Sequence, residues 1–168
     1  MEITLLEKAI RGNKRSLRHL LKNESEFIYK LALLHTKDEG DARIILRQTV
    51  TYIYNHIHKL SRNKNLDIYI TKITIMHINK YLSDIGIIEN DEVKMLNQDG
   101  KIDFYYAIDI LDNYSKNTMI LKYYYNMSFE DIGRVLDINE GTLKLYVRKS
   151  LKIMKEYYKE GLLYERKA

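Results

Sequence analysis

Cationic side chains near the C-terminus are the residues of this sequence best suited to binding a charged partner. Between Gly141 and Lys155 there are five basic residues and no acidic one. Lys144, Arg148 and Lys152 recur every four residues, which places them on one side of a helix. A helix with such a face can neutralise the phosphates of a nucleic acid. The alternative is an ordinary basic face exposed to solvent.

The residues in front of this basic helix predict a shorter helix and a tight turn. Ser128 is placed to cap the shorter helix, with Asp131 three residues on as in a capping box. Gly133 supplies a small residue where the two helices must cross closely. In the turn, Ile138 is expected to enter the core and Asn139 to cap the basic helix. This order predicts a helix-turn-helix, whose second helix enters the major groove of DNA.

The outer side of the basic helix carries the residues expected to touch DNA. Those near its N-terminus can reach base edges: Asn139, Glu140, Thr142, Lys144 and Leu145. Those further along are expected to meet the phosphate backbone: Arg148, Lys149 and Lys152. The inner side is predicted to consist of Leu143, Tyr146, Val147 and Ser150. A surface hairpin of two helices with a solvated basic face is the alternative.

The composition favours a helical protein without catalytic chemistry. The chain has 168 residues, no proline and seven glycines, which disfavours a turn-rich β protein. There is no cysteine, so disulfides and thiolate metal sites are excluded. The five histidines do not cluster with carboxylates, and no nucleophile–base pair or phosphate-binding glycine loop is evident. We therefore predict an all-α protein that is not an enzyme, with no metal and no cofactor.

The location of the protein is predicted from two absences in the sequence. No apolar run approaches the roughly 18 residues of a membrane helix. The N-terminal stretch "MEITLLEKAIRGNKR" is charged throughout and does not resemble a signal peptide. We therefore expect a cytoplasmic protein without membrane insertion.

Charge and periodicity divide the chain into two helical domains. The net charge is +7 over residues 1–83, −6 over residues 84–113 and +4 over residues 114–168. Two basic lobes suggest two contact surfaces for a polyanion, or simply solvated helix faces. Residues 84–106 are acidic and irregular and are predicted to be a linker. The predicted domains are therefore 1–83 and 107–168, and the second opens with a helical pattern that reaches Tyr124.

The first domain is predicted to consist of three main helical stretches. Residues 3–34 have helical spacing with a break at Gly12–Asn13. Asp41 is expected to cap the next helix, which reaches Leu60. Residues 66–82 are rich in β-branched side chains, which favours a strand, but their spacing and surroundings favour a helix. Three further apolar residues lie outside the core stripe of the middle helix and suggest either a partner surface or a helix buried on two sides: Ile44, Val50 and Tyr54.

The C-terminal third resembles the promoter −35-binding domain of bacterial RNA polymerase sigma factors of the extracytoplasmic-function type. The resemblance rests on "LDNYSKNTMILKYYYNMSFEDIGRVLDINEGTLKLYVRKSLKIMKE", and above all on "GTLKLYVRKSLK". In the first domain, "AIRGNKRSLRHLL", "DARIILRQTVTYIYNHI" and "NLDIYITKITIMHINKYLSD" resemble the first helical pair, the polymerase-docking helix and the −10-melting helix of the family. The resemblance covers almost the whole chain, with residues 84–106 as the variable linker.

This resemblance implies two further sets of site residues. The set implied for the −10 element is Arg62, Asn63, Lys64, Asn65, Tyr69 and Lys72. The set implied for core polymerase is Asp41, Ile44, Arg47, Gln48 and Thr51. The chain departs from the family at Arg43–Ile44 and Arg47–Gln48, where acidic residues and Gln-Glu are usual, and at Tyr69, Met76 and Ser83, where Trp, Asn and Arg are usual. Tyr69 is either a base-stacking residue or a core aromatic.

The resemblance implies a sigma factor that directs core RNA polymerase to promoters and initiates transcription. Core polymerase and promoter DNA are then its partners, an anti-sigma factor is a further candidate, and the free protein is expected to be a monomer. Two alternatives stay open. One is a stand-alone dimeric helix-turn-helix regulator, and the other is a sigma-like protein that occupies polymerase or an anti-sigma factor without opening DNA.

Overall fold

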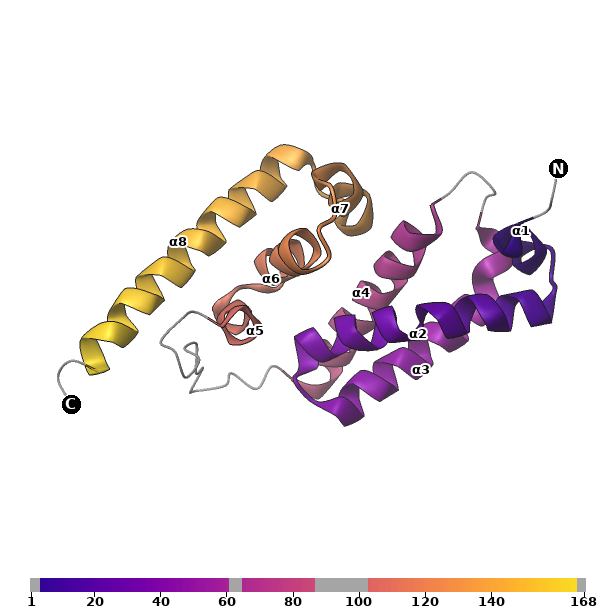
Figure 1. Ribbon diagram of the computed structural model, residues 1–168, viewed down its shortest axis with the longest axis horizontal. Coiled ribbons are helices and arrows are strands. Elements are labelled where there is room, and N and C mark those ends of the chain that lie inside the picture. The colour runs from indigo at the N-terminus through magenta and orange to yellow at the C-terminus, as the bar shows by residue number, and fades with distance from the viewer. Residues whose placement is uncertain (1–3, 61–64, 87–102, 166–168) are drawn as a thin grey trace. The chain divides into compact units, whose positions relative to one another are not determined.

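Every regular element of the described residues is a helix, so the predicted all-α fold is confirmed. The structure is a computed structural model, and it describes residues 4–60, 65–86 and 103–165. The chain divides into two compact units, Met1–Ile87 and Ile88–Ala168 (Figure 1).

The first unit is built on a long helical hairpin. Its elements are α1 (Leu5–Ile10), α2 (Lys14–Thr36), α3 (Glu39–His56), a 3-10 turn (Ile57–Lys59) and α4 (Leu66–Ile85). Only two residues join α2 to α3, so these helices pack side by side in opposite directions, and α4 packs against both (Figure 1). Lys37 makes this sharp connection with a left-handed backbone, φ 57°.

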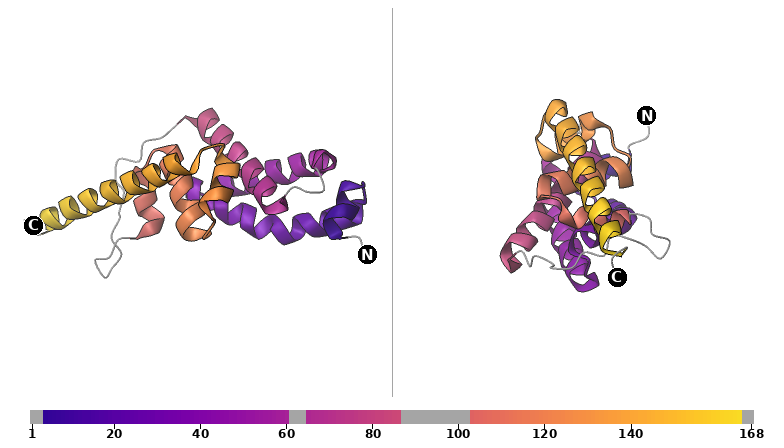
Figure 2. Two further views of the ribbon diagram at one scale, coloured as in Figure 1. Left: turned by 90° about the horizontal axis from the view of Figure 1, so that it is seen from above. Right: turned by 90° about the vertical axis from the view of Figure 1, so that its left-hand side faces the viewer.

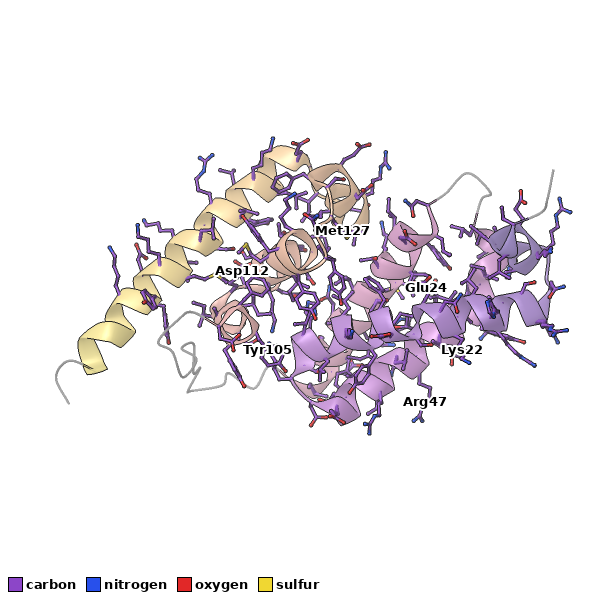
Figure 3. The ribbon with its side chains drawn as sticks, viewed as in Figure 1. Lys22, Glu24, Arg47, Tyr105, Asp112 and Met127 are labelled. Carbon is purple, nitrogen blue, oxygen red and sulfur yellow. The ribbon has the colours of Figure 1, made fainter. Side chains whose placement is uncertain are left out.

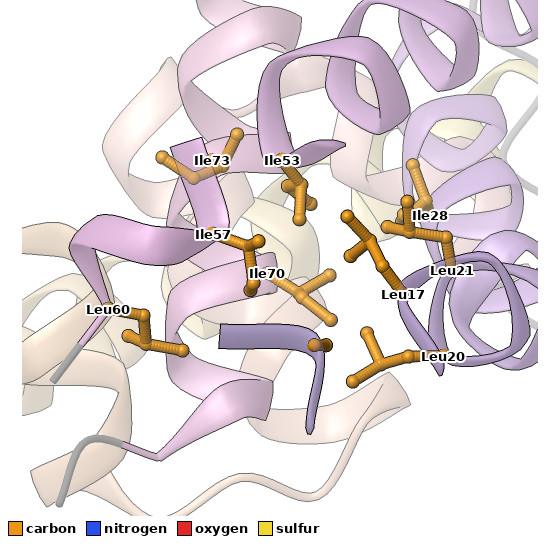
Figure 4. Packing of buried hydrophobic residues seen from close by; sticks show 10 residues of the cluster. Leu17, Leu20, Leu21, Ile28, Ile53, Ile57, Leu60, Ile70 and Ile73 are labelled. Atoms are coloured by element: carbon orange, nitrogen blue, oxygen red, sulfur yellow. The ribbon is translucent and has the colours of Figure 1, made fainter. Parts of the chain in front are cut away.

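Leucine and isoleucine side chains from all of these elements form the core of the first unit (Figure 4). Ile28, Ile53 and Ile70 are fully buried and come from α2, α3 and α4. Ala9 joins α1 to this cluster, and Ile57 and Leu60 join the turn that follows α3. Burial of such side chains contributes about 1.5–3 kcal/mol each. The cluster therefore fixes α1 and the end of α3 to the same hairpin.

Two predictions about the first unit have different outcomes. Residues 66–82 do lie in a helix, because Ile70, Ile73 and His77 form a buried helical stripe. The predicted cap at Asp41 is wrong. α3 begins at Glu39, and the carboxylate of Asp38 accepts a hydrogen bond from the backbone N–H of Asp41 at 2.9 Å. Asp41 lies inside the first turn instead.

The second unit consists of short helices packed along one long helix. Its elements are α5 (Phe104–Ala107), a 3-10 turn (Ile108–Ile110), α6 (Asn113–Met119), a π-helical turn (Ile120–Tyr124), α7 (Phe129–Leu136) and α8 (Glu140–Glu165). α6 and α7 pack against α8, which extends past both of them (Figures 1 and 2). The buried side chains between them include Met119, Leu121, Ile132, Leu143 and Met154.

The last two residues of the helical pattern that reaches Tyr124 are exposed, although the pattern predicts that they face the core. Met119 and Ile120 are buried, but Tyr123 and Tyr124 are 52% and 50% exposed. The chain forms a π-helical turn over Ile120–Tyr124, which has a longer repeat than an α-helix and so rotates the following side chains away from the core. Sequence periodicity assumes a constant helical repeat and cannot foresee this change.

The predicted linker lies mostly outside the described residues, which resume at Asp103 after Gly86. α4 ends at Ile85 and α5 begins at Phe104, so helices extend two or three residues into the range 84–106 from both sides. The roles given to domains 1–83 and 107–168 stay predictions.

Candidate nucleic-acid interface

A capped helix, α7, opens the helix-turn-helix. The Ser128 hydroxyl oxygen accepts a hydrogen bond from the Asp131 N–H at 3.0 Å and donates one to the Asp131 carboxylate at 2.8 Å. The predicted pairing of these residues is thus present, although the carboxylate binds the hydroxyl and not the backbone N–H of a full capping box. Ile132 and Val135 are buried and face the core. The cap and this stripe position α7 against α8.

The turn after α7 depends on glycine at position 133. A Cβ atom added to Gly133 would lie 2.7 Å from the carbonyl oxygen of Ile138, and 3.8 Å from the Leu143 side chain of α8. The close approach predicted for Gly133 is therefore present, but its tightest contact is the turn and not the second helix. Asp137 reverses the chain with φ 57°, and Ile138 is only half-buried. The turn is tight because the backbone folds directly over Gly133.

The first turn of α8 begins as predicted. The side-chain oxygen of Asn139 accepts a hydrogen bond from the Thr142 N–H at 2.9 Å, so Asn139 caps α8. Leu143 and Ser150 are fully buried on the inner side, and the Ser150 hydroxyl donates to the carbonyl of Tyr146 at 2.7 Å. Tyr146 stacks on Tyr114 of α6, with ring centroids 6.1 Å apart. These contacts set the rotation of α8 about its own axis.

The opposite side of α8 presents the predicted −35 residues to solvent. Those exposed there are Glu140, Lys144, Leu145, Arg148, Lys149 and Lys152, with Asn139 exposed at the cap and Thr142 half-buried. Leu145 is 60% exposed, which is unusual for leucine on a helix with a packed inner side. The structure brings these residues onto one surface, and their roles in DNA binding stay predictions.

Most charges on this surface already have partners. Lys144 pairs with Glu140 at 2.6 Å, and Lys149 of α8 lies 3.6 Å from the carboxylate of Asp112 at the start of α6. Arg148 makes no ion pair with any described residue. Exposed pairs of this kind contribute about 0–1 kcal/mol, so DNA phosphates can replace them at little cost. Arg148 is available without any exchange.

Phe129, which the sequence reasoning missed, places an aromatic ring near Lys144 of α8. The amino group of Lys122 lies 4.8 Å from the centre of its ring, and that of Lys144 lies 5.8 Å from it. Lys122 also donates a hydrogen bond to the carbonyl of Met127 at 3.2 Å. Two amino groups thus lie near the aromatic ring, and one of them, that of Lys144, belongs to the predicted base-reading residues. An aromatic residue directly after the Ser128 cap was the available signal.

The predicted −10 residues are only partly described. Arg62, Asn63 and Lys64 lie outside the described residues. The side-chain oxygen of Asn65 caps α4, accepting from the Asp67 N–H at 2.8 Å. Tyr69 is half-buried against the core of the first unit, and its burial raises the pKa of its hydroxyl. Lys72 is half-buried on α4. Tyr69 therefore serves the core with part of its ring and leaves part accessible.

The predicted polymerase-binding residues form one exposed row on α3, with one exception. Ile44, Arg47, Gln48 and Thr51 are exposed at helical spacing, and Figure 3 marks Arg47 on this helix. Asp41 is half-buried and accepts a hydrogen bond from the Tyr81 hydroxyl at 2.6 Å, which raises the pKa of Tyr81 to about 12. Asp41 therefore joins α3 to α4 and offers less of its carboxylate to a partner.

The three apolar residues of α3 that lie outside its predicted core stripe have two explanations in the structure. Val50 and Tyr54 are half-buried and pack against the core cluster, so they belong to a helix buried on more than one side. Ile44 is 40% exposed, so of the three residues it is the one accessible to a partner.

Histidines contribute to packing within the described residues. His77 is buried between α3 and α4, where its Nδ1 lies 3.3 Å from the Thr49 hydroxyl and 3.0 Å from the Ile73 carbonyl oxygen. Burial lowers the pKa of His77. No group of histidine and carboxylate side chains in the described part of the chain is arranged to hold a metal ion. Among these residues there is also no helix that is long and apolar enough to cross a membrane.

Comparisons with known proteins agree with the resemblance drawn from the sequence. The chain matches no protein-family model. It is 22% identical over 136 residues to the RNA polymerase sigma factor SigV of Bacillus subtilis (strain 168), covering 76% of this chain and 81% of SigV.

Two solved structures have the same fold. The structure of CnrH in complex with the cytosolic domain of CnrY matches with a TM-score of 0.73 and 12% identity, covering 93% of this chain and 96% of that one. The sigma factor RpoE in complex with the anti-sigma factor NepR, from Bartonella quintana, matches with a TM-score of 0.68 and 17% identity, covering 84% and 96%. Together with the similarity to SigV, this confirms the resemblance to sigma factors of the extracytoplasmic-function type.

Proposed function

We propose that this chain, which resembles sigma factors of the extracytoplasmic-function type in sequence and fold, directs core RNA polymerase to specific promoters. The second unit would read the −35 element with α8, and the first unit would dock on polymerase and open the −10 element. The chain has no catalytic role of its own in this process. Polymerase supplies the chemistry of RNA synthesis.

The observation that carries this proposal is the exposed basic side of α8. Asn139 and Gly133 hold the first turn of α8 at the end of a tight turn, and the buried Leu143 and Ser150 turn the opposite side outward. That side presents Arg148 without an ion-pair partner among the described residues. A helix mounted in this way can enter a major groove with its N-terminal residues at the base edges.

Two surfaces that each bind DNA weakly can together bind it tightly when polymerase holds both of them in one complex. The basic side of α8 spans few phosphates, so the free chain should bind DNA weakly and with a strong salt dependence. Once polymerase holds the chain, the second contact becomes intramolecular and gains from effective concentration. We infer that the free protein is a monomer in the cytoplasm and that specificity emerges in the complex. Core polymerase would contact the α3 row of Ile44, Arg47, Gln48 and Thr51.

An anti-sigma factor is a further proposed partner. CnrH and RpoE were each solved as a complex, the first with the cytosolic domain of CnrY and the second with the anti-sigma factor NepR. In this chain, Ile44 is an exposed apolar side chain in the predicted polymerase-binding row of α3, and Leu145 is one among the predicted −35 residues of α8. An inhibitor that covers such residues would block polymerase and DNA together.

Reconstituted transcription tests the proposal. The purified chain is mixed with sigma-free core polymerase, and start sites are mapped on its own upstream region and on a genomic fragment library. We expect discrete initiation that depends on this protein. Polymerase binding without initiation would favour the sigma-like interaction protein, and a stable dimer that binds a palindrome without polymerase would favour the stand-alone regulator.

An Arg148→Glu variant tests the role of α8. It should lose −35-dependent initiation while it still binds core polymerase, because repulsion replaces an attraction to phosphate. Lys159→Glu is the matched control, since it makes the same charge change on the same helix away from the predicted site. Unchanged promoter output from Arg148→Glu would show that α8 does not work on DNA.

A further inference from the structure

The first unit carries a second basic surface that none of the predicted sites includes. Between Lys8 and Lys22 the sequence has six lysines and arginines and no acidic residue. They are Lys8, Arg11, Lys14, Arg15, Arg18 and Lys22, and all six are exposed. None of them forms an ion pair with a described residue. We call these six residues the α1–α2 basic surface.

A rigid corner holds the two helices of this surface together. Gly12 has φ +90°, a conformation that glycine adopts easily, and the Asn13 side chain caps α2 by accepting from the Ser16 N–H at 2.9 Å. The Asn13 N–H also donates to the carbonyl of Lys8 at 3.0 Å. Ala9 is buried in the core cluster with Leu17. The basic side chains of α1 and α2 are therefore carried on one fixed backbone.

The charges on α2 face away from the core as a compact row. Leu17, Leu20 and Leu21 are buried and define the inner side of this helix. At about 100° of rotation per residue, Arg15, Arg18 and Lys22 fall within an arc of about 60° on the opposite side. Figure 3 marks Lys22 at the far end of this row on α2. Such a row follows the helix axis and presents several cations to one extended partner.

Acidic residues mark where the surface ends. Glu7 is occupied at the start of α1, where its carboxylate accepts from the Thr4 N–H at 2.9 Å. Past Lys22, Glu24 is half-buried near Asp67 of α4, and burial raises the pKa of Glu24. Beyond that, Glu26 pairs with Lys30 at 2.6 Å. The surface between these acids is therefore uniformly positive, unlike the mixed charges further along α2.

The α1 end of the surface lies beside the last described residues before the predicted −10 segment. α1 packs against the 3-10 turn Ile57–Lys59, and the Leu60 side chain is buried in the core cluster that also includes Ala9. The chain continues from Leu60 directly into the predicted −10 residues. Leu60, the last described residue before the predicted −10 residues, is therefore held near α1.

We propose that the α1–α2 basic surface binds the phosphate backbone of promoter DNA next to the −10 element. DNA as the partner rests on the proposed function, but the surface lies outside both predicted DNA-reading sites. Its charges lack partners within the described residues, and a polyanion gives them one with release of counterions. The contact carries no base specificity, because Lys and Arg at phosphates position a protein without reading sequence.

The salt dependence of DNA binding tests this surface without requiring promoter function. Binding of the full chain to a fluorescent oligonucleotide of random sequence, single-stranded and duplex, is measured by anisotropy over a series of NaCl concentrations. The test variant is Arg15→Gln with Arg18→Gln. Loss of two phosphate contacts should flatten the slope of log K against log salt by about 1.4 on single strands and about 1.8 on duplex. On duplex this is about a tenfold difference over a fourfold rise in salt.

Two matched variants isolate the cause. Arg15→Lys with Arg18→Lys keeps both charges and should keep the wild-type slope. Lys30→Gln with Lys80→Gln removes two exposed charges of the same unit away from the surface and should also leave the slope unchanged. An unchanged slope in the Arg15→Gln, Arg18→Gln variant would overturn the proposal. Equal flattening by Lys30→Gln with Lys80→Gln would also overturn it, because the effect would then be net charge alone.

Binding to core polymerase separates this proposal from the proposed function. If Arg15→Gln with Arg18→Gln keeps the wild-type DNA slope but no longer binds core polymerase, the surface is a protein contact and the proposal is wrong. If the slope flattens as expected and the wild-type chain fails to initiate with polymerase, the DNA surface stands and the sigma function fails.

Discussion

Removing either partner of the ion pair between Lys116 and Asp109 should loosen the helix-turn-helix unit more than any exposed charge change. The amino group of Lys116 on α6 lies 2.6 Å from the carboxylate of Asp109, and the two side chains are only 13% and 15% exposed. The pair joins α6 to the 3-10 turn Ile108–Ile110 in front of it. α6 in turn packs on α8, so the pair supports the helix that carries the basic side.

The expected magnitude follows from burial. Removing one partner of a buried pair costs about 3–5 kcal/mol, because the remaining charge loses its nearest opposite charge in a poorly solvated site. Both side chains keep some contact with water, so we expect about 3 kcal/mol for either Lys116→Met or Asp109→Asn. The double variant should cost clearly less than the sum, because the attraction between the two groups is then lost only once. The matched control is the pair of Arg43 and Glu39, whose side chains are 64% and 68% exposed and whose loss should cost about 0.3–0.5 kcal/mol.

Hydrogen exchange of the full chain, resolved by mass spectrometry, measures this effect in one unit at a time. A loss of about 3 kcal/mol should speed exchange of the α6 amides by about 150-fold, and the first unit should not change. Exchange of α3 amides should change by less than about threefold in Arg43→Gln. Additive losses in the double variant, or a change in α6 no larger than in the control, would refute the reasoning.

Three further outcomes are expected. Gly133→Ala should destabilise the second unit by about 1–2 kcal/mol in urea unfolding, because the 2.7 Å approach to the Ile138 carbonyl outweighs the gain of about 1 kcal/mol in helix propensity; a stabilised variant would contradict the geometry. The first unit should lose stability as pH falls below 6.5, because burial lowers the pKa of His77 and the unfolded chain takes up the proton first; His77→Gln should remove this part of the pH dependence. Asn139→Ala should cost about 1 kcal/mol, seen as faster exchange in the first turn of α8, whereas Asn139→Asp should cost little.

Cap residues show how far local sequence reasoning reached. Ser128 and Asn139 cap their helices as expected. Each cap is one hydrogen bond between a side-chain oxygen and a backbone N–H three residues further along, so it depends on neighbouring residues alone. Asp41 was expected to cap α3, and Asp38 does so. Both positions satisfy the same rule in the stretch "DEGD", and the choice between them depends on how the two-residue turn after α2 folds. A local pattern therefore located the helix but not its first residue.

Side-chain exposure shows where the sequence was insufficient. Met76 and His77 were equally compatible with the helical spacing of α4, and the structure buries His77 and leaves Met76 43% exposed. His77 lies within reach of the Thr49 hydroxyl, 28 residues away in sequence. Phe129 and the six residues of the α1–α2 basic surface are likewise present in the sequence. The sequence alone does not show that Phe129 lies near Lys144, or that the six basic residues are all exposed and form one surface. Contacts between elements create these features.

The sequence by itself determined the helical composition, the helix-turn-helix and the basic side of α8, because helical periodicity, caps and charge spacing are properties of neighbouring residues. Only the tertiary structure decided that Asp41 is bonded to Tyr81 across 40 residues, that Gly133 meets the Ile138 carbonyl, and that Tyr123 and Tyr124 face outward. These outcomes depend on how close distant segments come and on a local change of helical repeat. Neither is encoded in the spacing of residues along one helix.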